Sequence, residues 1–317
     1  MRAVVIAGHQ VTVCDRADPE PADHDLLVRV EAAGLNRADL LQVAGRYPPP
    51  NGVDPDIPGM DVAGEVIATG PAVEWFSPGD RVMGLVAGAA QAELALVDER
   101  AALKVPEQMS WAEAGGFPEI FCTAHDALVN QCELQKGERV LVSGAAGGVG
   151  VAAIQLALAL GAEVVVATVR DEARRDEVAA LGAEAVSPDQ GFRRGPFDVV
   201  VELVGAPNVG EDLEALATGG RVAVIGVGGG SRTEIDLFVL MNRRARLMGS
   251  MLRPRSIAEK QSVIEGVARD VLPLIESGKV RVPVDSTFAL SDADAAYRHF
   301  AEGGKFGKIV LVTHQSE

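Results

Sequence analysis

The chain has 317 residues, of which 48% are hydrophobic and 23% are charged, and these proportions exclude a mainly disordered protein. At about 150 residues per domain, the length predicts two domains. A formal net charge of −16 argues against nucleic acid and anionic membrane as partners, because both require a basic face. An anionic small ligand needs only a local basic pocket and stays possible.

The three cysteines, Cys14, Cys122 and Cys132, are never spaced as C-x-x-C. This pattern excludes a disulfide scaffold and a four-cysteine zinc lobe. It favours a reducing compartment, so we expect a cytoplasmic protein. We expect no signal segment or membrane helix, because the longest apolar tract, 149–162, is interrupted by Gln155 and is shorter than the roughly 18 residues that a span requires.

The segment up to residue 110 predicts a β-rich domain. Short apolar or alternating runs are separated there by proline and glycine turn signals. Strands are expected at 3–6, 26–32, 62–69, 81–86 and 92–96. Between them, 36–43 has the spacing of a short helix, and 46–58, with five prolines in thirteen residues, predicts a surface loop.

After residue 110 the pattern changes to alternating helices and strands. A helix is expected over 109–130, with a Ser110-x-x-Glu113 capping sequence at its start. The strands that follow are nearly pure Val, Ile and Leu, which is typical of a parallel sheet covered on both faces. We expect strands at 139–143, 163–168, 198–204 and 221–226, with helices at 148–160, 171–181 and 208–217. This alternation predicts a doubly wound α/β domain of the Rossmann type.

The C-terminal part lacks this alternation. We expect a strand at 246–251, a helix at 261–277, and strands at 283–288 and 308–312 with a helix at 291–302 between them. We interpret these last elements as rejoining the first domain. The predicted division is therefore 1–119 with 264–317 as a substrate domain and 120–263 as the nucleotide-binding domain, with cofactor and acceptor in the cleft between them.

The clearest chemical signal is a glycine-rich turn between a predicted strand and a predicted helix. It reads Val140-Leu141-Val142-Ser143-Gly144-Ala145-Ala146-Gly147-Gly148-Val149-Gly150. Backbone N–H groups at a helix N-terminus can bind a pyrophosphate. Gly147 and Gly148 allow close approach of the phosphates, and Gly150 allows the helix to pack on the strand. The strict G-x-G-x-x-G pattern has Ala145 at its first position, but the βαβ context favours a dinucleotide site over a structural turn.

The choice of dinucleotide is expected to depend on the end of the second strand of this domain. NAD-binding folds place a carboxylate there. In this chain Arg170 follows Val169, and Arg174 and Arg175 lie one helical turn further on. A guanidinium suits a 2′-phosphate, so the sequence favours NADP. In the competing interpretation, Asp171 binds the ribose hydroxyls and the arginines form a solvated helix face.

Several motifs along the chain resemble those of one enzyme superfamily and occur in the same order as in its members. They are Gly34-Leu35-Asn36-Arg37-Ala38-Asp39-Leu40-Leu41 with Gly45-Arg46-Tyr47, Pro58-Gly59-Met60-Asp61-Val62-Ala63-Gly64-Glu65-Val66, Gly79-Asp80-Arg81-Val82, Pro118-Glu119 with Thr123-Ala124, the glycine-rich turn, Gly219-Gly220-Arg221 to Gly226, 249–255, and Phe306-Gly307-Lys308-Ile309-Val310. Over nearly the whole chain the sequence resembles the medium-chain dehydrogenase/reductase superfamily. It is most similar to the zinc-free, zeta-crystallin-like NADPH quinone oxidoreductases, in particular their tumour-suppressor-inducible branch. The resemblance implies a GroES-like β-rich substrate domain beside the Rossmann domain.

The resemblance also implies an enzyme without zinc. Zinc-binding relatives carry Cys in place of Asn36 and a His-Glu pair in place of Met60-Asp61, and the four-cysteine lobe is missing. Without a Lewis acid, alcohol oxidation is disfavoured, and quinones or enones remain as hydride acceptors. Two departures from the bacterial quinone reductases bear on the quinone preference and on the detail of the phosphate site. Leu41 replaces an aromatic residue, and Ser187-Pro188-Asp189 stands where they tend to carry a Tyr near the adenosine phosphate.

Two residues are expected to contact the acceptor. Asn36 is interpreted as an amide that orients the acceptor oxygen, with a turn-forming residue as the alternative. Tyr47 is interpreted as a phenol that hydrogen-bonds or stacks on the acceptor, with a packed loop aromatic as the alternative. The expected cofactor contacts are Thr123, Ala145, Gly147, Gly148, Val149, Thr168, Arg170, Arg174 and Gly226. A helix-interior role is the alternative for Thr123, and the cluster Arg243, Arg244, Arg246, Arg253 and Arg255 is expected to be mostly solvated.

The sequence therefore predicts an NADPH-dependent, metal-free oxidoreductase that reduces a small quinone by hydride or electron transfer. The alternatives are an enone or enoyl reductase of the same superfamily and an NADPH-binding protein without turnover. A homodimer is expected through the strand at 246–251, because an unpaired sheet edge is an aggregation hazard unless it is covered.

Overall fold

The computed structural model describes residues 1–313, and the chain divides into two compact units. Unit 1 contains Met1–Ile120, Leu252–Gly303 and the segment that begins at Lys308, and unit 2 contains Phe121–Met251 with the short return Gly304–Gly307. The expected end of the nucleotide-binding domain, at residue 263, differs from the observed end at Met251. The difference arises because the chain enters the core of unit 1 at Arg253, which is only 2% exposed there.

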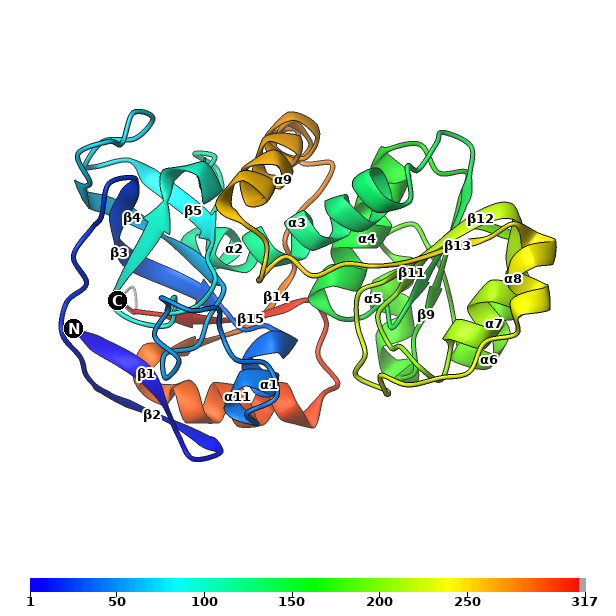
Figure 1. Ribbon diagram of the computed structural model, residues 1–317, viewed down its shortest axis with the longest axis horizontal. Helices are drawn as coiled ribbons and strands as arrows, with labels where there is room; N and C mark the ends of the chain where they lie inside the picture. Colours follow the sequence, from blue (N-terminus) through cyan, green and yellow to red (C-terminus); the bar gives the residue numbers. More distant parts are fainter. Residues whose placement is uncertain (314–317) are drawn as a thin grey trace. The chain divides into compact units, whose positions relative to one another are not determined.

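Unit 1 is built on a seven-stranded sheet in the order β14-β15-β3-β4-β5-β7, with β6 paired to β3. Its strands are β3 (Asp25–Gly34), β4 (Asp61–Thr69), β5 (Arg81–Leu85), β6 (Leu94–Asp98), β7 (Ala102–Lys104), β14 (Val284–Ala289) and β15 (Lys308–Val312). Buried residues alternate along most of β3, as expected for a strand with one face in a core. A separate hairpin of β1 (Arg2–Ala7) and β2 (Gln10–Asp15) packs against α11 (Ala293–Glu302) (Figure 1).

The helix expected over 109–130 is divided into three parts. They are α2 (Trp111–Gly116), α3 (Pro118–His125) and a π-helical turn over Asp126–Gln131. The capping sequence predicted at Ser110 is present, since the Glu113 N–H donates to the Ser110 hydroxyl. The interruption falls at Pro118, which has no N–H to continue α2 and is favoured at the first position of a new helix. The remaining helices of this unit are α1 (Arg37–Val43), α9 (Ile257–Asp270) and α10 (Leu272–Glu276).

Unit 2 is a parallel six-stranded sheet in the order β10-β9-β8-β11-β12-β13. Its strands are β8 (Arg139–Ser143), β9 (Val164–Thr168), β10 (Glu184–Val186), β11 (Phe197–Glu202), β12 (Leu216–Val224) and β13 (Arg246–Gly249). Numbered along the chain, this is the order 3-2-1-4-5-6 of a Rossmann sheet. The predicted doubly wound fold is confirmed, and β8 and β11 flank the point where the strand order reverses.

The helices of unit 2 are α4 (Gly148–Ala159), α5 (Arg175–Ala179), α6 (Pro188–Gly191), α7 (Val209–Glu214) and α8 (Leu237–Arg243), several of which are labelled in Figure 1. The helix expected over 171–181 is shorter than predicted, because a single 3₁₀ turn over Glu172–Arg174 precedes α5. Among residues 1–313, no helix is long and apolar enough to cross a membrane.

Candidate functional site

The glycine-rich turn of unit 2 lies between β8 and α4, at the point where the strand order reverses. Gly144 has a left-handed φ of +70°, and Gly147 caps the twelve-residue α4. A Cβ on Gly150 would lie 2.6 Å from the Ala145 backbone, so only glycine allows this close contact between turn and helix. A Cβ on Gly147 would meet no atom of another part of the described chain within 4 Å, so there is room beside this residue. The backbone of Gly307 lies against the turn, and its N–H donates to the Ala146 carbonyl (3.1 Å). This geometry fits the pyrophosphate of a dinucleotide.

The end of β9 is tied to this turn. The Thr168 hydroxyl accepts a hydrogen bond from the Gly144 N–H (3.2 Å), and the Ala145 N–H donates to the Thr168 carbonyl (3.0 Å). Thr168 is 2% exposed and Ala145 is fully buried. Both were predicted as cofactor contacts, and the structure places them as internal supports of the turn.

The arginines after β9 differ in their surroundings. Arg174 donates to the Gly304 carbonyl (2.7 Å) and pairs with Glu177 (2.9 Å), and Arg175 pairs with Glu172 (3.3 Å). Arg170 is exposed and makes no hydrogen bond or ion pair to any described residue. Asp171 caps the turn that follows by accepting from the Ala173 N–H (3.1 Å). Of the three arginines just named, Arg170 is therefore the one that no described residue already pairs.

The remaining predicted cofactor contacts also lie in unit 2. Thr123 is 7% exposed on α3, and Gly148 and Val149 are half-buried at the start of α4. The Gly226 N–H donates to the Glu202 carbonyl (3.1 Å), and a Cβ there would lie 2.3 Å from the Leu203 carbonyl oxygen. Gly226 is thus required for the close approach of two loops.

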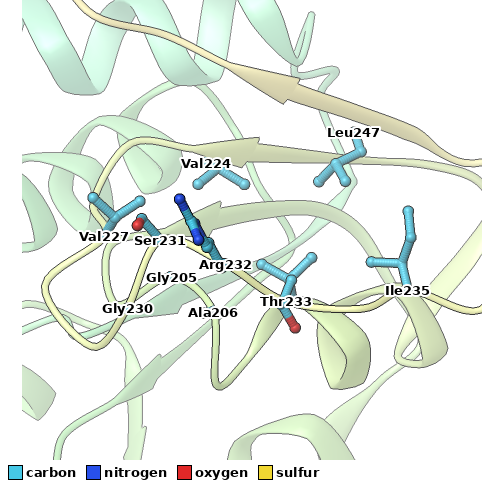
Figure 2. Close-up of a pocket in the computed structure, with 11 residues that line it drawn as sticks. Gly205, Ala206, Val224, Val227, Gly230, Ser231, Arg232, Thr233, Ile235 and Leu247 are labelled. Atoms are coloured by element: carbon cyan, nitrogen blue, oxygen red, sulfur yellow. The ribbon is translucent and has the colours of Figure 1, made fainter.

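A pocket of about 480 Å³ opens beside the loop that follows Gly226. The lining combines the apolar side chains Val209, Val224, Val227, Ile235 and Leu247 with Gly205, Ala206, Gly230, Ser231, Arg232 and Thr233. Figure 2 shows these residues, with all but Val209 labelled. None of the residues predicted as cofactor contacts lines it. The pocket lies towards the edge strand β13, so we do not assign it to the cofactor.

In unit 1, Asn36 belongs to a buried polar cluster with Asp61 and Lys308. The Lys308 ammonium donates to the carbonyl of Leu35 (2.9 Å), to Asn36 Oδ1 (2.7 Å) and to Asp61 Oδ2 (2.8 Å). Asn36 Nδ2 donates to Asp61 Oδ2 (2.9 Å), and the Glu119 N–H donates to Asp61 Oδ1 (2.6 Å). Asn36 therefore precedes α1 with its amide held by a carboxylate and an ammonium.

Asp39, on the first turn of α1, continues this cluster. It accepts from the Asn36 N–H (2.8 Å), the Gly59 N–H (3.2 Å) and Gln91 Nε2 (3.3 Å). Burial is the largest influence on its pKa, which is raised to about 6. Asp39 thus fixes the start of α1 beneath Asn36.

Tyr47 follows α1, and its backbone and ring both contact Arg253. The guanidinium donates to the carbonyls of Ala87 (2.6 Å) and Tyr47 (3.0 Å) and to Gln42 Oε1 (2.6 Å), and it lies 5.1 Å from the centroid of the Tyr47 ring. Burial raises the pKa of the Tyr47 phenol. The phenol is therefore protonated at neutral pH and can donate a hydrogen bond.

Of the arginine cluster that was expected to be mostly solvated, Arg253 is the buried member, at 2% exposed, and the other four are exposed or half-buried. Burial of a guanidinium requires several acceptors that converge from distant segments, and sequence alone does not show them. Lys308 belongs to one of the shared motifs, but the sequence assigned it no role. The adjacent Gly307 and the apolar strand that follows gave no sign that its ammonium is buried.

Within the described residues, no group of three or more His, Cys, Asp or Glu side chains is placed to hold a metal ion. Asp61 has donors on both of its carboxylate oxygens. A buried ammonium 2.8 Å from this carboxylate also opposes a second cation there.

Comparisons with known proteins match both units. The alcohol dehydrogenase GroES-like domain matches residues 22–133, and the zinc-binding dehydrogenase domain matches residues 148–269. Acryloyl-coenzyme A reductase of Metallosphaera sedula is 31% identical, over 99% of this chain and 100% of its own length. Quinone oxidoreductase-like protein 2 of Bos taurus is 29% identical, over 94% of this chain and 88% of its own length.

A solved structure of a quinone oxidoreductase from Thermus thermophilus, reported with its NADPH complex, superposes with a TM-score of 0.84. It is 32% identical and covers 98% of this chain and 100% of its own. These similarities extend through both units, so they concern the whole fold and are not limited to the nucleotide-binding unit.

Proposed function

The chain belongs to the medium-chain dehydrogenase/reductase superfamily and is an oxidoreductase, and from this premise we propose that it reduces quinones with NADPH and without a metal ion. The observation that carries the proposal is the Lys308 ammonium, which binds both Asn36 and Asp61. It places a fixed positive charge beside the polar groups of unit 1. Such a site suits an acceptor such as a quinone, which can accept a hydride without a Lewis acid.

The nucleotide part of the proposal rests on the glycine-rich turn and on Arg170. The turn presents the N-terminus of α4, whose first turn contains no acidic residue to repel a pyrophosphate. No described residue pairs with the Arg170 guanidinium, which lies just beyond the strand end where a 2′-phosphate is recognised. The Thermus quinone oxidoreductase, with a similar fold, is reported in complex with NADPH.

In the proposed reaction, bound NADPH supplies a hydride. Asn36 donates to the acceptor oxygen, which gains negative charge as the two electrons arrive. Tyr47 donates from its protonated phenol or stacks on the acceptor ring. Solvent supplies the proton that completes the hydroquinone. The protein contributes orientation and hydrogen bonding, so no strong general base is needed.

A second candidate is reduction of an activated C=C bond in an enone or enoyl thioester. The similarity to acryloyl-coenzyme A reductase over the full length of both chains favours it. The same oxygen-directed hydrogen bond would stabilise the enolate that forms when a hydride adds to the far carbon. The two candidates therefore differ in the acceptor and not in the roles of Asn36 and Tyr47.

We also propose a homodimer that pairs β13 of two chains. This strand is one of the two edge strands of the unit 2 sheet, and Val227 (49% exposed), Leu247 (36%) and Met251 (57%) are apolar and exposed near it. Light scattering should give twice the mass of the 33.1 kDa chain at micromolar concentration. A monomer at that concentration would disprove the pairing. The partner in catalysis is a small molecule, and a cytoplasmic location fits the three free cysteines.

The experiment that tests the function follows NADPH oxidation with matched panels of quinones and enones, including acryloyl-coenzyme A, in the presence of a strong chelator. We expect turnover of quinones that the chelator does not reduce. Turnover confined to the thioester would select the second candidate. Loss of activity on chelation, with restoration by zinc, would overturn the metal-free mechanism, and tight NADPH binding without turnover of any acceptor would indicate a binding protein.

A further inference from the structure

We propose that Lys308 is a positioning residue that fixes the Asn36 amide as a hydrogen-bond donor to the acceptor oxygen. The inference rests on the proposed function and assigns a direction to the polar group that binds the acceptor. Asn36 touches the acceptor, whereas Lys308 and Asp61 act only through Asn36.

Every hydrogen of the Lys308 ammonium has an acceptor. The three acceptors are a backbone carbonyl, an amide oxygen and a carboxylate oxygen, all between 2.7 and 2.9 Å away. The side chain is buried, and so is its partner Asp61. An ammonium carries three donors and no acceptor, so this one is fully used and its position is fixed.

The ammonium determines which end of the Asn36 amide faces it. In the observed orientation, Oδ1 accepts from Lys308 and Nδ2 donates to Asp61 (2.9 Å). The reversed amide would place an NH2 group against the ammonium and a carbonyl oxygen against the carboxylate. Both contacts would then be repulsive in a buried place where charges interact strongly. The pair of charges therefore excludes the reversed orientation.

This orientation leaves one hydrogen of the Asn36 amide available to a ligand. An amide nitrogen carries two hydrogens, and the hydrogen bonds of the described residues use one of those on Asn36 Nδ2, towards Asp61. The other gives Asn36 a donor for a ligand, while its oxygen faces the ammonium. A donor is the group that stabilises an oxygen gaining negative charge during hydride transfer. An amide can present either a donor or an acceptor to a ligand, and the charge pair fixes this one as a donor.

The surrounding backbone is shaped around the cluster. A Cβ on Gly34 would lie 2.8 Å from Asp61 Oδ2 and 3.0 Å from Lys308 Cε. The Glu119 N–H, at 2.6 Å, holds the other oxygen of Asp61. The charge pair therefore joins the starts of β4 and β15, is held by an N–H of α3 and packs closely on the end of β3, and it provides a rigid support for one amide.

The first test is a double-mutant cycle of Lys308→Met and Asn36→Ala, measured as kcat/KM across a series of quinones of graded reduction potential. We expect Lys308→Met to lower kcat/KM by about 10- to 100-fold, most for the least electron-poor quinone. In the Asn36→Ala background the same change should have almost no further effect. A general structural role would instead lower all rates equally and multiply in the double variant, which would overturn the proposal.

Two additional variants control for the possibility that Lys308→Met lowers activity only because the protein unfolds. Lys308→Arg keeps a cation and should recover most of the activity, and Asp61→Asn with Lys308→Met removes both charges together. Thermal unfolding, followed by circular dichroism, reports whether each variant is folded. Binding of NADPH, followed by nicotinamide fluorescence, should change less than about twofold, because the changes lie outside the nucleotide-binding unit.

The second test does not depend on turnover. In protein labelled with ¹⁵N-asparagine, the Asn36 side-chain amide is identified by its absence from Asn36→Ala. We expect one of its two hydrogens to be protected from exchange in the wild type and both to exchange rapidly in Lys308→Met. Equal protection in the two proteins would overturn the positioning role, whatever the acceptor assays show. Failure of the wild type to reduce any acceptor, with the amide signal as expected, would instead contradict the proposed function.

Discussion

The two units hold their candidate site residues in opposite ways. In unit 1, Asn36 and Tyr47 are held by side chains that are themselves buried, Lys308 and Arg253, and each of these cations donates to three acceptors. In unit 2, the candidate site is formed by the backbone of a glycine-rich turn and by the exposed Arg170. An acceptor that must be oriented for hydride transfer needs rigid side chains, whereas a long charged cofactor can be bound by repeated backbone N–H groups.

The contrast between the two units can be tested by mutation, and the largest effect is expected at Arg253. Arg253→Met removes three hydrogen bonds and leaves buried acceptors unpaired. Each such acceptor costs about 1–3 kcal/mol, so we expect a loss of about 3–5 kcal/mol in the stability of unit 1. Denaturant unfolding and quinone turnover should both show it, while NADPH binding persists at low denaturant. The control is Arg298→Met, which removes an exposed pair with Asp294 and should cost less than about 1 kcal/mol. Equal effects of the two variants would contradict the buried support.

A pair of glycine variants sharpens the view of unit 2. Gly150→Ala places a methyl group 2.6 Å from the Ala145 backbone and should destabilise the fold by about 1–3 kcal/mol. Gly147→Ala meets no described atom and has a φ of −78° that alanine adopts readily. This variant should have the same unfolding temperature as the wild type. Its affinity for NADPH should be lower by about tenfold or more, since the methyl group occupies space expected for the phosphates. Unchanged binding by a folded Gly147→Ala would exclude the turn as the phosphate site.

The same contrast explains what the sequence could predict. The glycine-rich turn, the parallel sheet and the place of Arg170 follow from local patterns, because backbone geometry and strand periodicity are properties of neighbouring residues. The buried roles of Arg253 and Lys308 arise from partners more than 150 residues away in the chain, such as Gln42 and Asn36. No local pattern distinguishes these cations from solvated ones. Ala145 was expected at the cofactor because it lies within the glycine-rich turn, and Thr168 because it lies at the end of the second strand of the domain. The structure places both in the support of the turn.

Secondary structure was predicted best where a strand is a continuous buried apolar run. The boundaries of β8 and β15 agree with the expected strands at 139–143 and 308–312. The hairpin strand β2 and the short helix α8 were not expected. Both are short and partly exposed, so their hydrophobic patterns are too brief to distinguish from loops.

Cofactor preference tests the charged part of unit 2. Arg170→Ala should weaken NADPH binding by about 10- to 100-fold, the worth of one charge-assisted hydrogen bond, and leave NADH binding almost unchanged. Arg174→Ala should have a smaller effect, because Arg174 is already engaged by Glu177 and the Gly304 carbonyl. Both dissociation constants can be measured by nicotinamide fluorescence. If wild type binds both cofactors equally, Asp171 recognises the ribose and the assignment to NADP is wrong.

The smallest expected effect concerns a buried carboxyl pair in unit 2 that has no cation among the described residues. Asp212 is fully buried, and neither of its oxygens has a donor there. Burial, and next the charge of Glu202, raise its pKa to about 9. Glu202 meanwhile accepts hydrogen bonds from the N–H of Gly205 (2.6 Å) and from Asn208 Nδ2 (3.1 Å). Unit 1 balances its buried carboxylate with Lys308, whereas unit 2 retains a proton on Asp212.

The sign of the pH dependence follows from this proton. The folded chain holds it up to about pH 9, whereas the unfolded chain releases it near the ordinary Asp pKa of about 4. Stability therefore falls as pH rises between these values. Asp212→Asn removes the titration and should raise the stability of unit 2 by about 1 kcal/mol or more at pH 8, with little change at pH 4. Thermal unfolding of both proteins at the two pH values measures this difference, and an equal shift at both would show that Asp212 is charged in the folded protein.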